Sequence, residues 1–306
     1  MAQNKQTAFV QAEPLVKEKR LQDKVALVTG GGRGIGRAIA LAFSANGANL
    51  ALISRTTTEL EQVAGEVRKL QGEAFVRRAD VSKADEISQT VSEVLYHYKR
   101  IDILVNAAGV YGPIGLTAEA DIQEWTRAME VNLFGAFICS RLVLPHMMAR
   151  KKGKIINMAG GGAASPLPRF TAYGVSKTAV VRLTETLAEE LKELKIQVNA
   201  IAPGMVDTKI QDDVLAAGER AGDLFHRIQK LRETGEGGTS PQVAANLAVF
   251  LASEASDGLT GKLIAAPHDG WESWDAARIQ ELMSLPWFTL RRMDSFTLKP
   301  FIEKLK

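Results

Sequence analysis

The chain has 306 residues, of which 46% are hydrophobic, 24% charged and 6% aromatic, as in an average globular protein. The formal net charge of +3 is too small to indicate binding to nucleic acid or to an anionic membrane surface. The single cysteine, Cys139, excludes an intramolecular disulfide and any metal site built from several cysteines. No uninterrupted run approaches 18 apolar residues, and the polar N-terminus lacks the apolar stretch of a secretory signal. We therefore expect a cytoplasmic protein without a membrane span.

Short apolar runs alternate with helical patterns in the first half of the chain. Residues 25–29 are apolar and are followed by glycines, which is typical of a strand buried on both faces of a parallel sheet. Further strands are predicted at 49–54, 75–79 and 101–106. Helices are predicted at 37–46, 59–70 and 82–99, and a longer one at about 120–148 with an interruption near Pro145.

The same alternation continues in the second half. Strands are predicted at 154–158, 197–201 and 259–265, and helical patterns at 180–194, 205–238 and 241–253. Because strands and helices alternate without an internal repeat or a proline-rich linker, we expect one α/β domain at 22–270 with a doubly wound parallel sheet. Residues 1–21 are expected to form a polar extension.

The segment 271–306 breaks this rhythm and contains three of the four tryptophans, Trp271, Trp274 and Trp287. Because exposure of so much aromatic surface to water is unfavourable, this tail should be covered. It packs either on the core or on another subunit, or part of it closes over the substrate pocket.

A glycine-rich segment, Thr-Gly-Gly-Gly-Arg-Gly-Ile-Gly at 29–36, lies between the first strand and the first helix. A pyrophosphate group needs backbone N–H groups at a helix N-terminus and no side chains in its way. Gly30, Gly34 and Gly36 would supply the turn, the close approach and the tight packing of helix against strand. The segment therefore predicts a dinucleotide site.

The second predicted strand ends in Ser54-Arg55. An acidic residue at that point would bind the ribose 2′-hydroxyl of NAD and repel a phosphate. Here a hydroxyl and a guanidinium stand in its place, and Arg33 adds a second guanidinium from the glycine-rich segment. Two arginines suit a dianionic 2′-phosphate, so the sequence favours NADP(H) over NAD(H).

Tyr173 and Lys177 are four residues apart in a predicted helix and therefore lie on one face of it. A tyrosine with an ordinary pKa near 10 is a poor acid–base catalyst at neutral pH. We expect the nearby ammonium to lower the pKa of Tyr173 towards the working range.

Taken together, these features resemble the short-chain dehydrogenase/reductase family over about residues 22–270. Further matching segments are Asp80-Val81, the Asn-Ala-Ala-Gly motif at 106–109, Asn132, and Pro203-Gly204 followed by Thr208. The resemblance implies a Rossmann-type sheet of about seven strands and hydride transfer between NADP(H) and a carbonyl/alcohol pair. It also implies a homodimer or homotetramer built through the helices at 120–148 and 173–195.

The resemblance also implies roles for individual residues. Tyr173 would protonate the carbonyl oxygen, Lys177 would lower its pKa and hold the nicotinamide ribose, and Asn132 would hold a water. The cofactor-binding set that we predict comprises Gly30, Gly32, Arg33, Gly34, Ile35, Gly36, Ser54, Arg55, Asp80, Val81, Asn106, Ala107, Ala108, Gly109, Tyr173, Lys177, Pro203, Gly204 and Thr208. The four histidines lack metal-ligand spacing, so no metal is expected.

The sequence departs from the family at one catalytic position. The family usually has a serine thirteen residues before the tyrosine, where it hydrogen-bonds the substrate carbonyl, but here that position is Gly160 and Ala159 precedes it. Three alternatives are open: Ser165 (or Thr171) reaches in, the backbone N–H groups of Gly160 and Gly161 substitute, or turnover is reduced. Because losing one such donor costs about 10²–10³ in rate, its loss weakens an enzyme before it abolishes activity.

Loops after the fourth, fifth and sixth strands should wall the substrate pocket, which is mostly apolar with one cation. The pocket residues that we predict are Tyr111, Leu167, Arg169, Phe170 and Met205. The leading interpretation is an NADP(H)-dependent oxidoreductase acting on a ketone or secondary alcohol as its small-molecule substrate. The alternatives are a 3-oxoacyl-thioester reductase, a sugar or polyol dehydrogenase, or a weakly active or non-catalytic NADP(H)-binding sensor or assembly protein.

Overall fold

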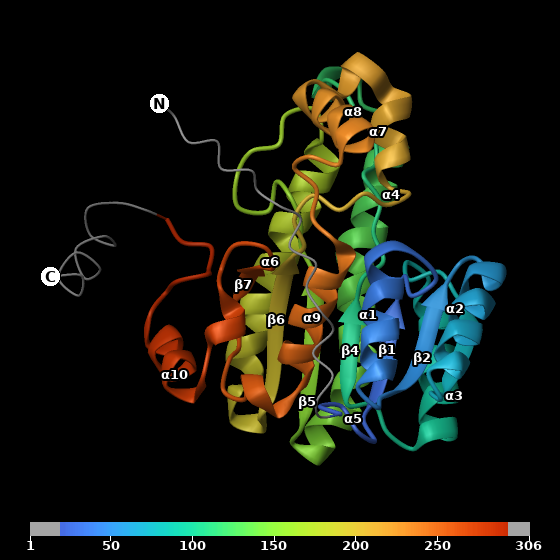
Figure 1. Ribbon diagram of the computed structural model, residues 1–306, viewed down its shortest axis with the longest axis vertical. Helices are drawn as coiled ribbons and strands as arrows, with labels where there is room; N and C mark the ends of the chain where they lie inside the picture. The colour runs from blue at the N-terminus through green and yellow to red at the C-terminus, as the bar shows by residue number, and fades with distance from the viewer. Residues whose placement is uncertain (1–18, 293–306) are drawn as a thin grey trace, which may run out of the picture.

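A seven-stranded parallel sheet lies at the centre of the computed structural model, which describes residues 19–292 (Figure 1). The strand order is β3-β2-β1-β4-β5-β6-β7, so the direction of winding reverses between β1 and β4. The expected doubly wound α/β sheet is confirmed. The strands are β1 Val25–Thr29, β2 Asn49–Ser54, β3 Ala74–Arg78, β4 Ile103–Asn106, β5 Gly153–Met158, β6 Ile196–Ala202 and β7 Leu263–Ala265.

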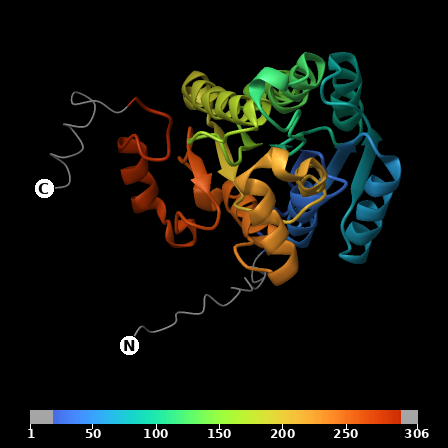
Figure 2. The ribbon, with the colours of Figure 1, turned by 90° about the horizontal axis from the view of Figure 1, so that it is seen from above.

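Two layers of helices cover the sheet (Figure 2). One face packs against α1 Gly34–Ala45, α2 Thr57–Lys69 and α9 Pro241–Ala252. The other packs against α3 Ala84–Tyr98, α5 Gly135–Arg150 and α6 Thr171–Leu191. The central strands read as uninterrupted apolar runs because both faces are buried, and every residue of β1 and β4 is buried.

The remaining helices lie at the ends of this frame. At the carboxyl end of the sheet, α7 Gln211–Ala217 and α8 Asp223–Thr234 stand above the strands (Figure 1). Beside β7 lies α10 Ala276–Ser284. Short turns complete the described chain: η1 Thr117–Glu119, η3 Lys192–Leu194, η4 Gly218–Ala221, η5 Glu254–Ser256 and η6 Trp271–Ser273.

The long helix of the first half differs from the prediction. It runs from α4 Ile122–Met129 through a π-helical turn, η2 Glu130–Phe134, into α5. The predicted interruption near Pro145 is wrong, because α5 continues through that proline. Val143 and Met147 beside it are buried against the sheet, and this packing holds the helix although proline removes one backbone hydrogen bond.

The continuous helix Ile122–Arg150 has 29 residues and is long and apolar enough to cross a membrane by length and composition alone. The sequence has no uninterrupted run of 18 apolar residues, and this helix meets the criterion only as an average over a window. Buried polar residues such as Asn132 and Ser140 interrupt the apolar run, but the average over a window of the helix stays apolar. Core helices meet the same criterion, and this one packs against β4, α3 and α6.

The two ends of the described chain pack on the domain. Leu21 is fully buried and donates its N–H to the Asn46 carbonyl (2.9 Å), so the packed region begins before residue 22. Trp271 and Trp274 are buried in the core beside α9, and Leu263 of β7 donates its N–H to the Phe288 carbonyl (2.7 Å). Residues 1–18 and 293–306 of the expected extension and tail lie outside the described residues.

Replacement of Trp271 by alanine tests how the tail contributes to stability. We expect a loss of about 3–5 kcal/mol in the free energy of unfolding, because a buried ring is removed and leaves a cavity. Tyr96→Ala is the matched control, since the side chain of Tyr96 is 81% exposed. Urea denaturation of both variants makes the comparison. Equal, small losses would show that the tail does not stabilise the domain.

Candidate active site

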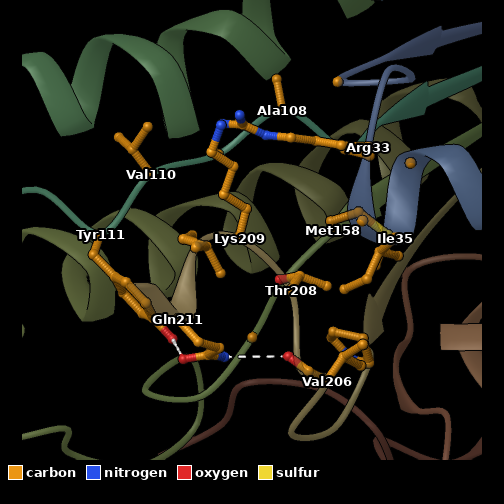
Figure 3. A pocket seen from close by; sticks show the side chains of 18 of the residues that line it. Arg33, Ile35, Ala108, Val110, Tyr111, Met158, Val206, Thr208, Lys209 and Gln211 are labelled. Carbon is orange, nitrogen blue, oxygen red and sulfur yellow. Dashed lines mark hydrogen bonds between the residues drawn. The ribbon is translucent and has the colours of Figure 1, made fainter. Parts of the chain in front are cut away.

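A cavity of about 580 Å³ opens at the carboxyl end of the sheet. It lies where the strand order reverses between β1 and β4, which is the usual ligand position in open α/β sheets. Figure 3 shows side chains from the glycine-rich loop, the loop after β4, the end of β5 and the segment after β6 converging on it. One cavity thus collects residues that are far apart in the sequence.

The glycine-rich loop leaves room for a ligand only because side chains are absent. A Cβ on Gly36 would lie 2.3 Å from the Gly30 carbonyl oxygen, and one on Gly30 would lie 2.9 Å from the Ala108 backbone. Helix α1 begins at Gly34, three residues earlier than predicted, and its N-cap residue Arg33 makes no side-chain cap. The first N–H groups of α1 are therefore free of a cap at the cavity, as a pyrophosphate requires. The loop fits the phosphates of a dinucleotide.

Ser54 and Arg55 line the same cavity, together with Arg33. The structure adds Glu59, which sequence reasoning missed: its Oε1 accepts a hydrogen bond from Arg33 Nη1 (3.2 Å). The sequence does contain a signal for this contact, because Glu59 is in the first turn of the helix that follows the second strand. That turn faces the end of the strand.

Asp80 and Val81 line the cavity from the end of β3. Burial alone would raise the pKa of Asp80, but hydrogen bonds from Ser82 and an ion pair with Arg127 outweigh it and hold that pKa below its usual range. Asp80 is therefore a fixed anion held by its neighbours.

Asn106 does not line the cavity, in contrast to its predicted cofactor contact, whereas Ala107, Ala108 and Gly109 do. Its side chain is buried between strands and donates from Nδ2 to Asn157 Oδ1 (2.8 Å). Asn106 is the last residue of β4, and its side chain is directed into the core, where it links β4 to β5.

Tyr173 and Lys177 lie side by side in α6, and both line the cavity. Lys177 Nζ is 5.6 Å from the centre of the Tyr173 ring and donates to the Met158 carbonyl (2.8 Å). Burial raises the pKa of Tyr173, with Tyr111 adding to the effect, and burial lowers the pKa of Lys177 to about 8. The predicted lowering of the Tyr173 pKa is thus wrong for this structure, because desolvation dominates and the ammonium faces a carbonyl.

Asn132, at the π-helical turn, does not line the cavity. Its Nδ2 donates to the Val110 carbonyl and to Ser176 Oγ (both 2.9 Å), and its Oδ1 accepts from the Val110 N–H (2.9 Å). Both of its N–H donors are therefore used within the protein. In this arrangement Asn132 holds the loop after β4 against α6.

Gly160, at the position of the absent serine, lies directly beneath the Tyr173 hydroxyl. A Cβ at Gly160 would lie 2.2 Å from Tyr173 Oη, whereas one at Gly161 would meet nothing within 4 Å. Ser165 is exposed and does not line the cavity, because the loop after β5 carries it to the surface. Thr171 Oγ1 accepts a hydrogen bond from Trp125 Nε1 (3.3 Å). Of the candidate donors, only the backbone of Gly160 and Gly161 lies at the cavity.

The substrate end of the cavity is mainly apolar. The Tyr111 ring lies 4.7 Å from the Tyr173 ring, and its hydroxyl donates to Gln211 Oε1 (3.1 Å), which is the contact drawn in Figure 3. Leu167 and Met205 line this end as predicted, and Leu224 and Arg227 of α8 join them unpredicted.

Two residues predicted to line the pocket, Phe170 and Arg169, instead pack behind the residues that line it. Phe170 is fully buried with its ring centre 5.2 Å from that of Tyr111, and Arg169 donates to the Arg220 carbonyl (3.2 Å). Neither lines the cavity, since the loop turns both towards the α7–α8 segment. Within residues 19–292 no group of three or more histidine, cysteine, aspartate or glutamate residues could hold a metal ion.

Comparison with known proteins places the chain in a family. The short chain dehydrogenase model matches residues 24–218. The chain belongs to the short-chain dehydrogenase family. It is 36% identical over 248 residues to an NAD-dependent glycerol dehydrogenase of Listeria innocua, covering 80% of this chain and 93% of that protein. It is 32% identical over 245 residues to a 3-oxoacyl-[acyl-carrier-protein] reductase of Thermotoga maritima, covering 80% and 96%.

Two solved structures that are similar to this chain contain different nicotinamide cofactors. Xylitol dehydrogenase bound to NAD⁺ matches with a TM-score of 0.75 and 28% identity, covering 80% of this chain and 98% of that one. Actinorhodin polyketide ketoreductase with NADPH matches with a TM-score of 0.74 and 31% identity, covering 79% and 95%. The family binds nicotinamide dinucleotides, and membership alone does not select NAD or NADP.

The contact between Gly160 and Tyr173 can be tested with a small substitution. In Gly160→Ala the added methyl group collides with the Tyr173 hydroxyl, and we expect turnover to fall by about tenfold or more as the hydroxyl is displaced. Gly161→Ala is the control, because its added methyl group meets nothing within 4 Å. Steady-state reduction of a ketone, followed through the absorbance of the reduced nicotinamide, compares the two. Full activity in Gly160→Ala would contradict the observed packing.

Proposed function

We propose that the protein is an NADP(H)-dependent oxidoreductase that transfers a hydride between the nicotinamide and a ketone or secondary alcohol. The observation that carries the proposal is the single cavity lined by the glycine-rich loop, by Arg33 and Arg55, and by Tyr173 and Lys177. A phosphate cradle, two guanidinium groups and an acid–base pair thus share one space.

Different parts of the cavity would hold different parts of the cofactor. The N–H groups at the start of α1 would bind the pyrophosphate, and Ser54, Arg55 and Arg33 the 2′-phosphate. Asp80 and Val81 would border the adenine, and Lys177 would hold the nicotinamide ribose. Pro203, Gly204 and Thr208 would lie beside the nicotinamide. When bound, the nicotinamide supplies or accepts the hydride.

Tyr173 would serve as the acid in reduction and as the base in oxidation. Because burial raises its pKa, the hydroxyl is protonated at neutral pH and ready to donate to a carbonyl oxygen. We propose that the N–H groups of Gly160 and Gly161 bind that oxygen in place of the absent serine, as backbone donors do in oxyanion holes.

The substrate end of the cavity favours a hydrocarbon-bearing ketone. Leu167, Met205 and Leu224 offer apolar surface, whereas a polyol would need several polar partners. The similarity to a 3-oxoacyl-[acyl-carrier-protein] reductase keeps 3-oxoacyl thioesters as a second candidate. A non-catalytic NADP(H)-binding role is the alternative of another class.

We further propose that the protein acts in the cytoplasm as a homodimer or homotetramer. Large apolar side chains are exposed on the two long helices, where a second copy would cover them: Phe134 at the end of η2, Phe137 and Met148 in α5, and Val175 in α6. Exposed large apolar side chains favour burial in an interface between subunits.

Replacement of Tyr173 by phenylalanine tests the proposed reaction. We expect turnover of ketones to fall by about 10²–10⁴, because the positioned proton donor is removed. The dissociation constant of NADPH should change by less than about twofold, since the ring and its packing remain. Turnover is followed across ketones, 3-oxoacyl thioesters and sugars, and binding by calorimetry. Tight NADPH binding without turnover in the unmodified protein would instead support the non-catalytic role.

The buried Lys177 gives a pH dependence that needs no substrate. Its pKa is about 8 in the folded chain and 10.5 in the unfolded one, so the unfolded state binds more protons between these pH values. Stability should therefore rise with pH from about 8 to 10.5, by up to about 3 kcal/mol from this group. Lys177→Met should lose that rise. Urea denaturation of both proteins at several pH values makes the comparison, and parallel stability profiles would contradict the shift.

A further inference from the structure

We propose that Glu59 sets the choice of cofactor: its carboxylate competes with the 2′-phosphate of NADP(H) for the cations of the site, so that the protein binds NAD(H) as well. The inference rests on the proposed function, because it concerns a dinucleotide in the same cavity. It assigns a specificity-determining role to a side chain outside the family motifs described above.

Glu59 lies in the first turn of α2 and lines the cavity beside Ser54 and Arg55. Its Oε1 is 3.2 Å from Arg33 Nη1 and 4.0 Å from Lys209 Nζ. In Figure 3 the side chain of Arg33, from the glycine-rich loop, and that of Lys209, from the segment after β6, extend towards the same region of the cavity. A single carboxylate is therefore shared by two cations from opposite sides of the cleft.

The approach between Glu59 and the glycine-rich loop is close. A Cβ on Gly32 would lie 3.0 Å from the Glu59 Cβ and 3.2 Å from Ser54 Oγ. The side chain of Glu59 is 26% exposed and that of Arg33 is 49% exposed. The carboxylate is thus partly shielded from water, at the place where the adenosine ribose is expected.

Electrostatics makes this carboxylate unfavourable for one cofactor and useful for the other. A 2′-phosphate carries almost two negative charges, and it has to share the Arg33 guanidinium with Glu59, which already accepts a hydrogen bond from its Nη1 (3.2 Å). It then remains beside a like charge. A 2′-hydroxyl is neutral and donates a hydrogen bond to a carboxylate, which is how an acidic residue near the ribose selects NAD. Arg55 and Lys209 still attract the phosphate, so neither cofactor is excluded.

Calorimetric titration with NADPH and NADH tests the inference directly. We expect the unmodified protein to bind both dinucleotides. In Glu59→Gln the competing charge is gone, and the ratio of the NADH to the NADPH dissociation constant should rise by about fivefold or more, mainly through tighter NADPH binding. The effect should shrink at high salt, because it is electrostatic.

The control is Glu61→Gln, which removes the same charge from an exposed position on the same helix that does not line the cavity. It should leave both dissociation constants unchanged. Glu59→Ala provides a second variant, and thermal unfolding verifies that each variant is folded.

Each outcome decides a separate question. If both dinucleotides bind and neither Glu59 variant changes their ratio, the role of Glu59 is wrong. If the unmodified protein binds NADPH but no NADH, the inference is also wrong, although the proposed function stands. If neither dinucleotide binds, the proposed function itself fails.

Discussion

The close contact between backbone segments around Gly30 shapes the rest of the site. Helix α1 can dock on the end of β1 only because position 36 has no side chain, and the loop after β4 can approach only because position 30 has none. Thr29 reinforces this contact, since its Oγ1 accepts hydrogen bonds from the N–H groups of Ala107 (3.1 Å) and Ala108 (3.3 Å). The ends of β1 and β4 are held together there, and the cavity opens above them.

The absence of a side chain at Gly160 determines where Tyr173 lies in the cavity. At Gly160 the absence of a Cβ makes room for the Tyr173 hydroxyl, which therefore lies close to the end of β5. The same packing removes Tyr173 and Lys177 from water and shifts their pKa values in the directions that disfavour charge. Burying two titratable groups without an acidic partner costs stability, and such a cost is expected where function requires the groups.

Buried asparagine side chains hold the strands, loops and helix around the cavity in fixed relative positions. Asn106 and Asn157 join β4 to β5, and Asn157 Nδ2 donates to Thr184 Oγ1 of α6 (2.8 Å). Asn132 links the loop after β4 to Ser176, one residue before Lys177. Helix α6, which carries Tyr173 and Lys177, is thus hydrogen-bonded to β5 through Asn157 and to the loop after β4 through Asn132. The role of these asparagines is to position residues that line the cavity.

Much of this architecture follows from local patterns in the sequence. Alternating apolar runs and helical periodicity predicted the strands of the sheet, and the glycine spacing predicted the tight turn between β1 and α1. The spacing of Tyr173 and Lys177 placed both on one face of a helix. These predictions succeed because hydrophobic periodicity, backbone freedom at glycine and helical repeat depend only on residues close together in the chain.

Only the tertiary structure decided the features that depend on distant segments. These include the pairing of Glu59 with Arg33 and Lys209, the contact of Gly160 with Tyr173, and the direction of the Tyr173 pKa shift. The exposure of Ser165 and the continuity of the helix through Pro145 also belong here. Each depends on how much water is excluded and on which side chains meet across the sheet, and both are set by the packing of the whole domain.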